Sequence, residues 1–281
     1  GSLQPHQVEA ADVYLKHIGV DKDACADAGG GAILELPCGY GKCLAKDTPI
    51  LMWNGTIKKV QDVLPDDLLV GDDSTPRRVL SICRGREPLF RIRGKGGYAG
   101  DYVVNQSHIL CLKYYHNSRV YDIPLTDYLE HYVGNNEKPL NSRIMGYRTT
   151  VNWSEKPVIQ SPTTWFESID TNGYGAIPME YKRNSFSIRA ELLAAIVKKW
   201  KTGTNGLVEI VNRSEAFLED VQYLARSLGV VVSSNILHIT NLCGEPLYKI
   251  NLLGPWKGIL PETEISNTTV KNQYSFDVEP L

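Results

Sequence analysis

Residues 43–63 of this 281-residue chain read CLAKDTPILMWNGTIKKVQDV, and the predicted fold rests on this segment. Strand-like segments lie on both sides of Asn54-Gly55, a pair that is typical of the tight turn in a β-hairpin. Further short strand-like segments continue to about Lys113, with turns such as Gly71-Asp72-Asp73 between them. We therefore predict a compact, mainly β module. Its expected strands lie around residues 49–53, 56–60, 79–83, 89–93 and 102–112.

A second segment, residues 100–113, reads GDYVVNQSHILCLK and carries a histidine within a strand pattern. Together with the first block it resembles the start and the histidine-bearing segment of an intein, the self-splicing element with the horseshoe-like, all-β Hint fold. The resemblance implies that the bond between Lys42 and Cys43 is the scissile bond, and that His108 acts on the amide nitrogen of Cys43 as a general acid. The usual Thr three residues before this His is Asn105 here, whose amide can still donate to the carbonyl oxygen.

The chemistry at this junction follows from the residues themselves. The thiol of Cys43 can reach the Lys42 carbonyl through a five-membered ring and convert the amide into a thioester. A thiol is far more nucleophilic than a hydroxyl near neutral pH, and the oxyanion that forms needs hydrogen-bond donors. We therefore expect a single-turnover, autocatalytic acyl shift that requires no cofactor and no metal ion.

A predicted α+β region follows, with amphipathic helices in SIRAELLAAIVKKWKTGTNG (187–206) and SEAFLEDVQYLARSLG (214–229). The pair resembles the second half of a LAGLIDADG homing endonuclease, which implies an inserted domain over residues 114–261. The resemblance places an Asp for Mg²⁺ where this chain has Lys198, and no first copy of the motif is recognisable before Ile177. We therefore predict a degenerate insert without nuclease activity or DNA binding, which could dock a partner fragment.

The amino-terminal segment, residues 1–42, is a predicted short α/β element. Its stretches 3–15 and 33–42 resemble the start of a superfamily-two helicase of large DNA viruses, which makes this segment the N-extein. A phosphate-binding loop would continue with Ser or Thr and a helix, but Cys43 follows, so we expect no ATPase activity. Cys38, five residues earlier, could form a disulfide that masks the nucleophile under oxidation.

The carboxyl end, residues 262–281, predicts a returning Hint strand in YSFDVEPL (274–281). An intein closes with His-Asn followed by Cys, Ser or Thr, and this sequence stops before such a segment. We therefore expect the amino-terminal half of a split intein, whose partner is a C-terminal intein fragment that bears a Thr-started C-extein. A truncated chain is the alternative.

Composition limits the remaining functions. Hydrophobic residues make up 42% and charged residues 22%, which argues against wholesale disorder, and the net charge of −2 does not favour general nucleic-acid binding. Six scattered cysteines form no disulfide framework, and no apolar run approaches the roughly 18 residues of a membrane helix. These features predict a cytosolic protein, and the helicase resemblance of residues 1–42 implies the host-cell cytosol or the nucleus of a virus-infected cell. The rival functions are a homing endonuclease or DNA-binding protein, and an ATP-binding helicase fragment.

Overall fold

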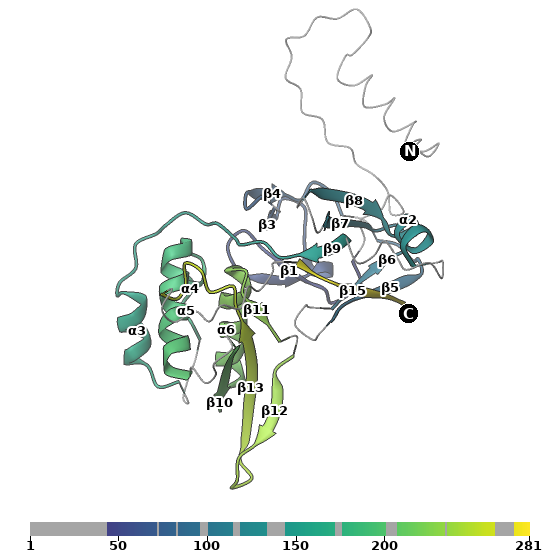
Figure 1. Cartoon of the computed structure of the whole chain (residues 1–281). Helices are drawn as coiled ribbons and strands as arrows, with labels where there is room; N and C mark the ends of the chain where they lie inside the picture. The colour runs from purple at the N-terminus through teal and green to yellow at the C-terminus, as the bar shows by residue number, and fades with distance from the viewer. Residues whose placement is uncertain are drawn as a thin grey trace, which may run out of the picture.

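The computed structural model describes residues 44–71, 73–82, 84–95, 101–114, 119–133, 144–171, 176–200, 207–233, 235–261 and 273–281. Over these ranges the chain is mainly β, with several small sheets and few helices, which agrees with the prediction of a Hint-like β domain. Buried apolar side chains form two separate clusters. Figure 1 shows the two corresponding parts, which we name the β unit (described residues of 44–147 and 273–281) and the α+β unit (described residues of 158–260).

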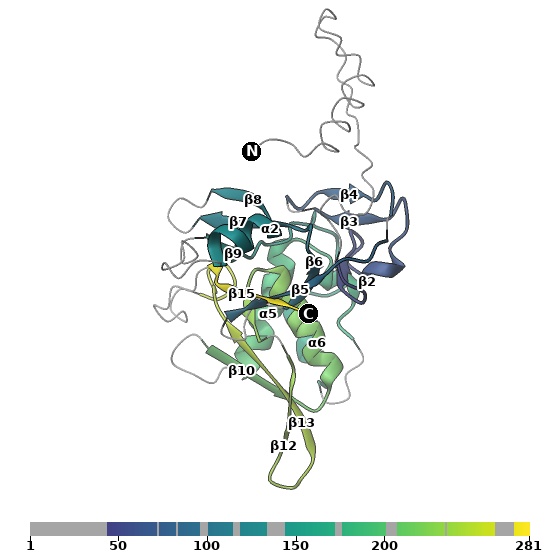
Figure 2. The same ribbon diagram turned by 90° about the vertical axis from the view of Figure 1, so that its right-hand side faces the viewer.

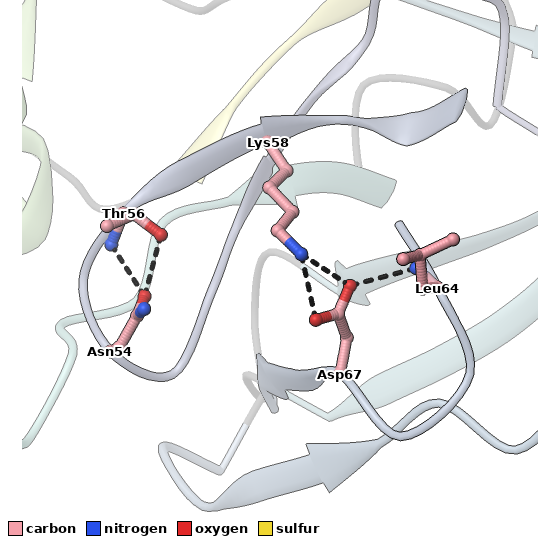
Figure 3. A network of polar contacts seen from close by, with 5 residues as sticks. All are labelled: Asn54, Thr56, Lys58, Leu64 and Asp67. Carbon is pink, nitrogen blue, oxygen red and sulfur yellow. Dashed lines mark hydrogen bonds and ion pairs between the residues drawn. The ribbon is translucent and has the colours of Figure 1, made fainter. Parts of the chain in front are cut away.

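The first block folds as the predicted hairpin. Strand β1 (Pro49–Leu51) pairs antiparallel with β2 (Ile57–Lys59). Gly55 lies at the tip with φ +87°, a backbone conformation that side chains disfavour. Asn54 stabilises the turn because its Oδ1 accepts hydrogen bonds from the N and Oγ1 of Thr56 at 3.0 and 2.7 Å (Figure 3).

A second hairpin, formed by β3 (Leu68–Val70) and β4 (Pro76–Arg78), lies beside the first. A polar network joins the two (Figure 3): Nζ of Lys58 lies 2.8 Å from each carboxylate oxygen of Asp67, and Oδ2 of Asp67 also accepts from the backbone N of Leu64 at 2.8 Å. The ion pair with Lys58 is the main reason that the pKa of Asp67 lies below its usual value. The two hairpins therefore hold each other through side chains as well as backbone.

The central strands differ partly from the prediction. Strand β5 (Leu89–Gly94) lies where expected, but the predicted strand 102–112 is two strands, β6 (Tyr102–Asn105) and β7 (Ile109–Tyr114), with a turn between them. The strand predicted over residues 79–83 is wrong for its described part, 79–82, where two of the apolar side chains are exposed and no ladder forms.

Distant parts of the chain complete the β unit. Strand β15 (Phe276–Pro280) returns to pair with β5, in the order β15-β5-β6, and a second sheet has the order β14-β9-β7-β8. The latter adds β8 (Val120–Pro124), β9 (Ile144–Tyr147) and β14 (Gln273–Tyr274). The boundary predicted after Lys113 therefore falls inside the β7–β8 hairpin, because residues beyond it supply ladder partners. The short helical turns of this unit are η1 (Val60–Asp62), α2 (Leu125–Tyr128) and the π-helical η3 (Leu129–Val133).

The α+β unit packs helices on a four-stranded antiparallel sheet. Its helices are α3 (Pro162–Ser168), α4 (Met179–Lys182), α5 (Phe186–Trp200) and α6 (Glu215–Ser227). Its strands are β10 (Leu207–Asn212), β11 (Val231–Val232), β12 (Leu237–Thr240) and β13 (Pro246–Leu253). The sheet order is β10-β13-β11, with β12 also paired to β13, and the β12–β13 ribbon projects away from the helices in both views (Figures 1 and 2).

The two predicted helices of this unit are confirmed, and local chemistry explains their ends. The hydroxyl of Ser214 accepts a hydrogen bond from the backbone N of Phe217 at 3.2 Å and so caps α6. Gly229 follows the helix with φ +77°, which ends it. No helix in the described ranges is long and apolar enough to cross a membrane.

The two units touch at the tip of the first hairpin. The hydroxyl of Tyr223 in α6 donates to the carbonyl of Gly55 at the β1–β2 tip, over 2.9 Å. The hydroxyl of Ser74, two residues before β4, donates to the carbonyl of Thr150 in the segment between the two units, at 3.2 Å. The β1–β2 hairpin is therefore part of the β unit by its ladder and part of the contact with the α+β unit by its tip.

Candidate functional site

The turn between β6 and β7 brings the predicted histidine next to the end of a buried strand. Strand β6 ends at Asn105, and the backbone N of His108 donates to the carbonyl of Asn105 at 3.1 Å, which closes the turn. The carbonyl of His108 in turn accepts from the backbone N of Leu125 at 2.8 Å. The backbone at both site residues is therefore held by hydrogen bonds within the fold.

Asn105 is buried, with 4% of its surface exposed, and its amide is oriented by an acidic neighbour. Its Nδ2 donates to Oε2 of Glu87 at 2.7 Å. Its Oδ1 is buried and has no hydrogen-bond partner in the described part of the chain. A buried polar atom without a partner is costly, so Oδ1 is free to accept a hydrogen bond from a polar group that reaches this turn.

His108 also carries a buried polar atom that lacks a hydrogen-bond partner in the described part of the chain. Its Nδ1 is buried and, among the described residues, finds no hydrogen-bond partner. Burial lowers the pKa of His108 below its ordinary value of 6.5, so the imidazole is neutral at neutral pH. A neutral imidazole can accept a proton at one nitrogen and give one up at the other, which is the requirement for proton transfer.

The first described residues run beside this site. Leu44 forms an antiparallel bridge with Val104, the residue before Asn105, and the backbone N of Ala45 donates to the carbonyl of Val103 at 2.9 Å. The chain therefore enters the described structure along β6, at its Asn105 end. The structure thus brings Asn105 and His108 together in one turn and places Leu44, the neighbour of the predicted nucleophile, opposite Val104 at the end of β6. The predicted residues Cys38, Lys42 and Cys43 themselves lie outside the described residues.

One residue of this site, Glu87, was not predicted from the sequence. Glu87, just before β5, contacts both Asn105 and Ser107, whose Oγ donates to the same Oε2 at 2.9 Å. Sequence patterns give no signal for it, because the contact depends on the register in which Leu89 lies opposite Asn105. Only the pairing of β5 with β6 shows that Glu87, two positions before Leu89, reaches the turn between β6 and β7.

Elsewhere, the described residues contain no group of three or more His, Cys, Asp or Glu side chains that could hold a metal ion. Lys198 is exposed in the last turn of α5, beside Lys199. Cations at the carboxyl end of a helix complement its dipole. The position of Lys198 therefore has an ordinary structural explanation, and the degenerate endonuclease remains a prediction.

Comparison with known proteins supports the assignment of the β unit to a Hint-like fold. Residues 43–129 match the family model of the Hom_end-associated Hint domain, which supports a Hint-fold, intein-like domain and, through it, the class of protein-splicing and autoprocessing domains. The match also extends beyond the predicted boundary at residue 113, as the β7–β8 pairing does. A stretch of 82 residues is 28% identical to the catalytic subunit of the V-type proton ATPase of Candida tropicalis and covers 26% of this chain and 8% of that protein. Because so little of that protein is covered, its ATPase activity is not carried over.

Proposed function

We propose that the β unit catalyses an N-to-S acyl shift at the bond between Lys42 and Cys43. The sulfur of Cys43 attacks the carbonyl carbon of Lys42, a C–S bond forms, and the C–N bond breaks. The thiol proton ends on the departing nitrogen, so the products are a thioester and a free α-amine, and no external reagent is consumed. The observation that carries the proposal is the pair of buried atoms on Asn105 and His108 that have no hydrogen-bond partner among the described residues, together with Leu44, which bridges Val104 at the same end of β6.

His108 is the proton carrier in this scheme. Because its pKa is lowered by burial, the imidazole begins neutral, accepts the thiol proton and delivers a proton to the amide nitrogen. Nδ1 is the nitrogen assigned to the amide, since it is buried and without a partner in the described ranges. Protonation of the nitrogen is what turns an amide into a group that can leave.

Asn105 binds the scissile peptide. Its Nδ2 carries two hydrogens, of which one goes to Glu87, so the second can donate to the carbonyl oxygen as it becomes an oxyanion. Its Oδ1 can accept an N–H from the same stretch of backbone. A peptide offers both a donor and an acceptor, which suits the two atoms of this turn that lack a partner among the described residues.

The thioester would then pass residues 1–42 to a nucleophile supplied by a C-terminal intein segment and its C-extein. We assign the α+β unit the task of holding the β1–β2 hairpin and docking that segment, supported by its contact with Gly55. No step requires a metal ion, ATP or DNA.

Dithiothreitol cleavage tests the proposal, because the thiol attacks a thioester but not an amide. The rate of release of residues 1–42 should fall by about 100-fold or more in His108→Gln, the usual loss for a missing general acid–base. His238→Gln is the matched control, since the His238 side chain is 72% exposed and lies in β12. Equal rates in His108→Gln and wild type would refute the role of His108.

A further inference from the structure

We infer that Glu87 is a positioning residue for the acyl shift, acting through Asn105 and the turn that carries His108. The inference rests on the proposed function, because it assigns Glu87 a part in that reaction and no chemistry of its own. Glu87 is half-buried just before β5, and no sequence motif singles it out.

The geometry is that of a two-point clamp. A single oxygen, Oε2 of Glu87, accepts from Nδ2 of Asn105 at 2.7 Å and from Oγ of Ser107 at 2.9 Å. Both donors lie in the segment that ends at His108. Hydrogen bonds to a charged acceptor are stronger than neutral ones, so the pair restrains the turn more firmly than two ordinary side-chain contacts would.

Backbone pairing supports the same clamp. The backbone N of Gln106 donates to the carbonyl of Pro88 at 3.0 Å, and Leu89 lies opposite Asn105 in the β5–β6 ladder. Three consecutive residues, Glu87 to Leu89, thus contact Asn105, Gln106 and Ser107. The backbone bonds fix where this turn lies, and the carboxylate fixes how its side chains point.

The chemical consequence concerns the amide of Asn105. A carboxylate can only accept, so Nδ2 and not Oδ1 must face Glu87. This orientation leaves Oδ1 and the second hydrogen of Nδ2 for the scissile peptide. Without the carboxylate, the amide can rotate by half a turn and exchange its donor and acceptor, and the oxyanion would then meet an oxygen.

Glu87→Gln tests the clamp, because glutamine keeps the size of the side chain but carries both a donor and an acceptor. It can therefore pair with the Asn105 amide in either of its two orientations. We expect release of residues 1–42 by dithiothreitol to slow by about 10-fold, the equivalent of one charge-assisted hydrogen bond. The midpoint of thermal unfolding should stay close to that of the wild type. Glu130→Gln, which removes the same charge from an exposed residue of η3, should release at the wild-type rate.

A double-mutant cycle separates positioning from general damage. In an Asn105→Ala background, Glu87→Gln should slow release by less than about 2-fold, because the amide that the carboxylate orients is gone and glutamine can still accept from Ser107. An equal 10-fold effect in both backgrounds, or a wild-type rate in Glu87→Gln alone, would overturn the inference. Failure of the proposed function looks different: the wild type itself would then release nothing, or His108→Gln would match it.

Discussion

Nε of Arg183 donates to the backbone carbonyl of Trp53 at 2.7 Å, and this bond joins the α+β unit to the tip of the first hairpin. The guanidinium also lies 5.4 Å from the centroid of the Trp53 ring. Arg183 directly follows α4 of the α+β unit, and Trp53 follows β1 of the β unit. The two residues are 130 positions apart in the sequence, and their contact holds the two units together. The hairpin that begins the β unit is therefore fixed from outside it.

Gly55→Ala should weaken this junction. A Cβ at Gly55 would lie 3.0 Å from Cβ of Arg183 and 3.1 Å from Sδ of Met179, on a backbone with φ +87°. Gly244→Ala is the control, since Gly244 has φ +80° but no atom within 4 Å of the added Cβ. We expect a loss of about 1 kcal/mol of unfolding free energy at Gly244 from backbone strain alone, and at least ~2 kcal/mol at Gly55. Equal losses in urea denaturation would show that the tip is not confined.

Arg189→Met should destabilise the α+β unit strongly. Arg189 is fully buried, and its guanidinium donates to the carbonyls of Asn184, Ser227 and Val151. Burial lowers its pKa to about 10, so it remains charged at neutral pH. Loss of these donors leaves buried carbonyls unsatisfied, at a cost of about 3 kcal/mol in urea denaturation.

Arg213→Met is the control for that substitution. The ion pair of Arg213 with Glu245 has partners whose side chains are 57% and 48% exposed. Exposed pairs of this kind contribute little, so the change should be below ~0.5 kcal/mol. If the two variants lost equal stability, burial would not explain the importance of Arg189.

Stability should depend on His108 below neutral pH. Its folded pKa lies below the ordinary 6.5 because burial disfavours the cation, so between these two values the unfolded chain binds more protons. Stability is therefore retained above pH 6.5 and falls as the pH drops from 6.5 toward the folded pKa. His108→Gln should remove that part of the decline when urea denaturation at pH 7 is compared with pH 5.5. An unchanged decline would assign it to other groups.

Magnesium should not confer nuclease activity. Lys198 supplies a cation where the endonuclease resemblance calls for a carboxylate ligand, and Mg²⁺ requires oxygen ligands. Supercoiled plasmid incubated with the protein and Mg²⁺ should therefore remain as intact as plasmid incubated with EDTA. Magnesium-dependent nicking would revive the homing-endonuclease alternative.

Local signals predicted the first hairpin and the two long helices. Asn54-Gly55 dictates its turn through glycine's positive φ, and Ser214 and Gly229 mark the ends of α6 through capping. These features depend on residues within a few positions of one another. They can therefore be predicted from the sequence without knowledge of the fold.

The pairing of strands that are distant in the sequence could not be predicted from local sequence patterns. Strand β4 has three exposed residues, Pro76 to Arg78, so no apolar alternation reveals it. Strand β9 is defined by partners in β7 and in β14, more than 120 positions away in the case of Tyr147 and Gln273. The same distinction applies to the candidate site. A sequence motif predicted Asn105 and His108, whereas the contact of Glu87 could be identified only from the register in which β5 pairs with β6.

Intact mass after incubation with excess dithiothreitol tests the central claim most directly, with Cys43→Ala measured in parallel. The acyl shift predicts that the wild type loses residues 1–42 and leaves a fragment that begins at Cys43, whereas Cys43→Ala keeps its full mass. An uncut wild type, or the same cleavage in Cys43→Ala, would contradict the assignment of Cys43 as the nucleophile of a splicing domain.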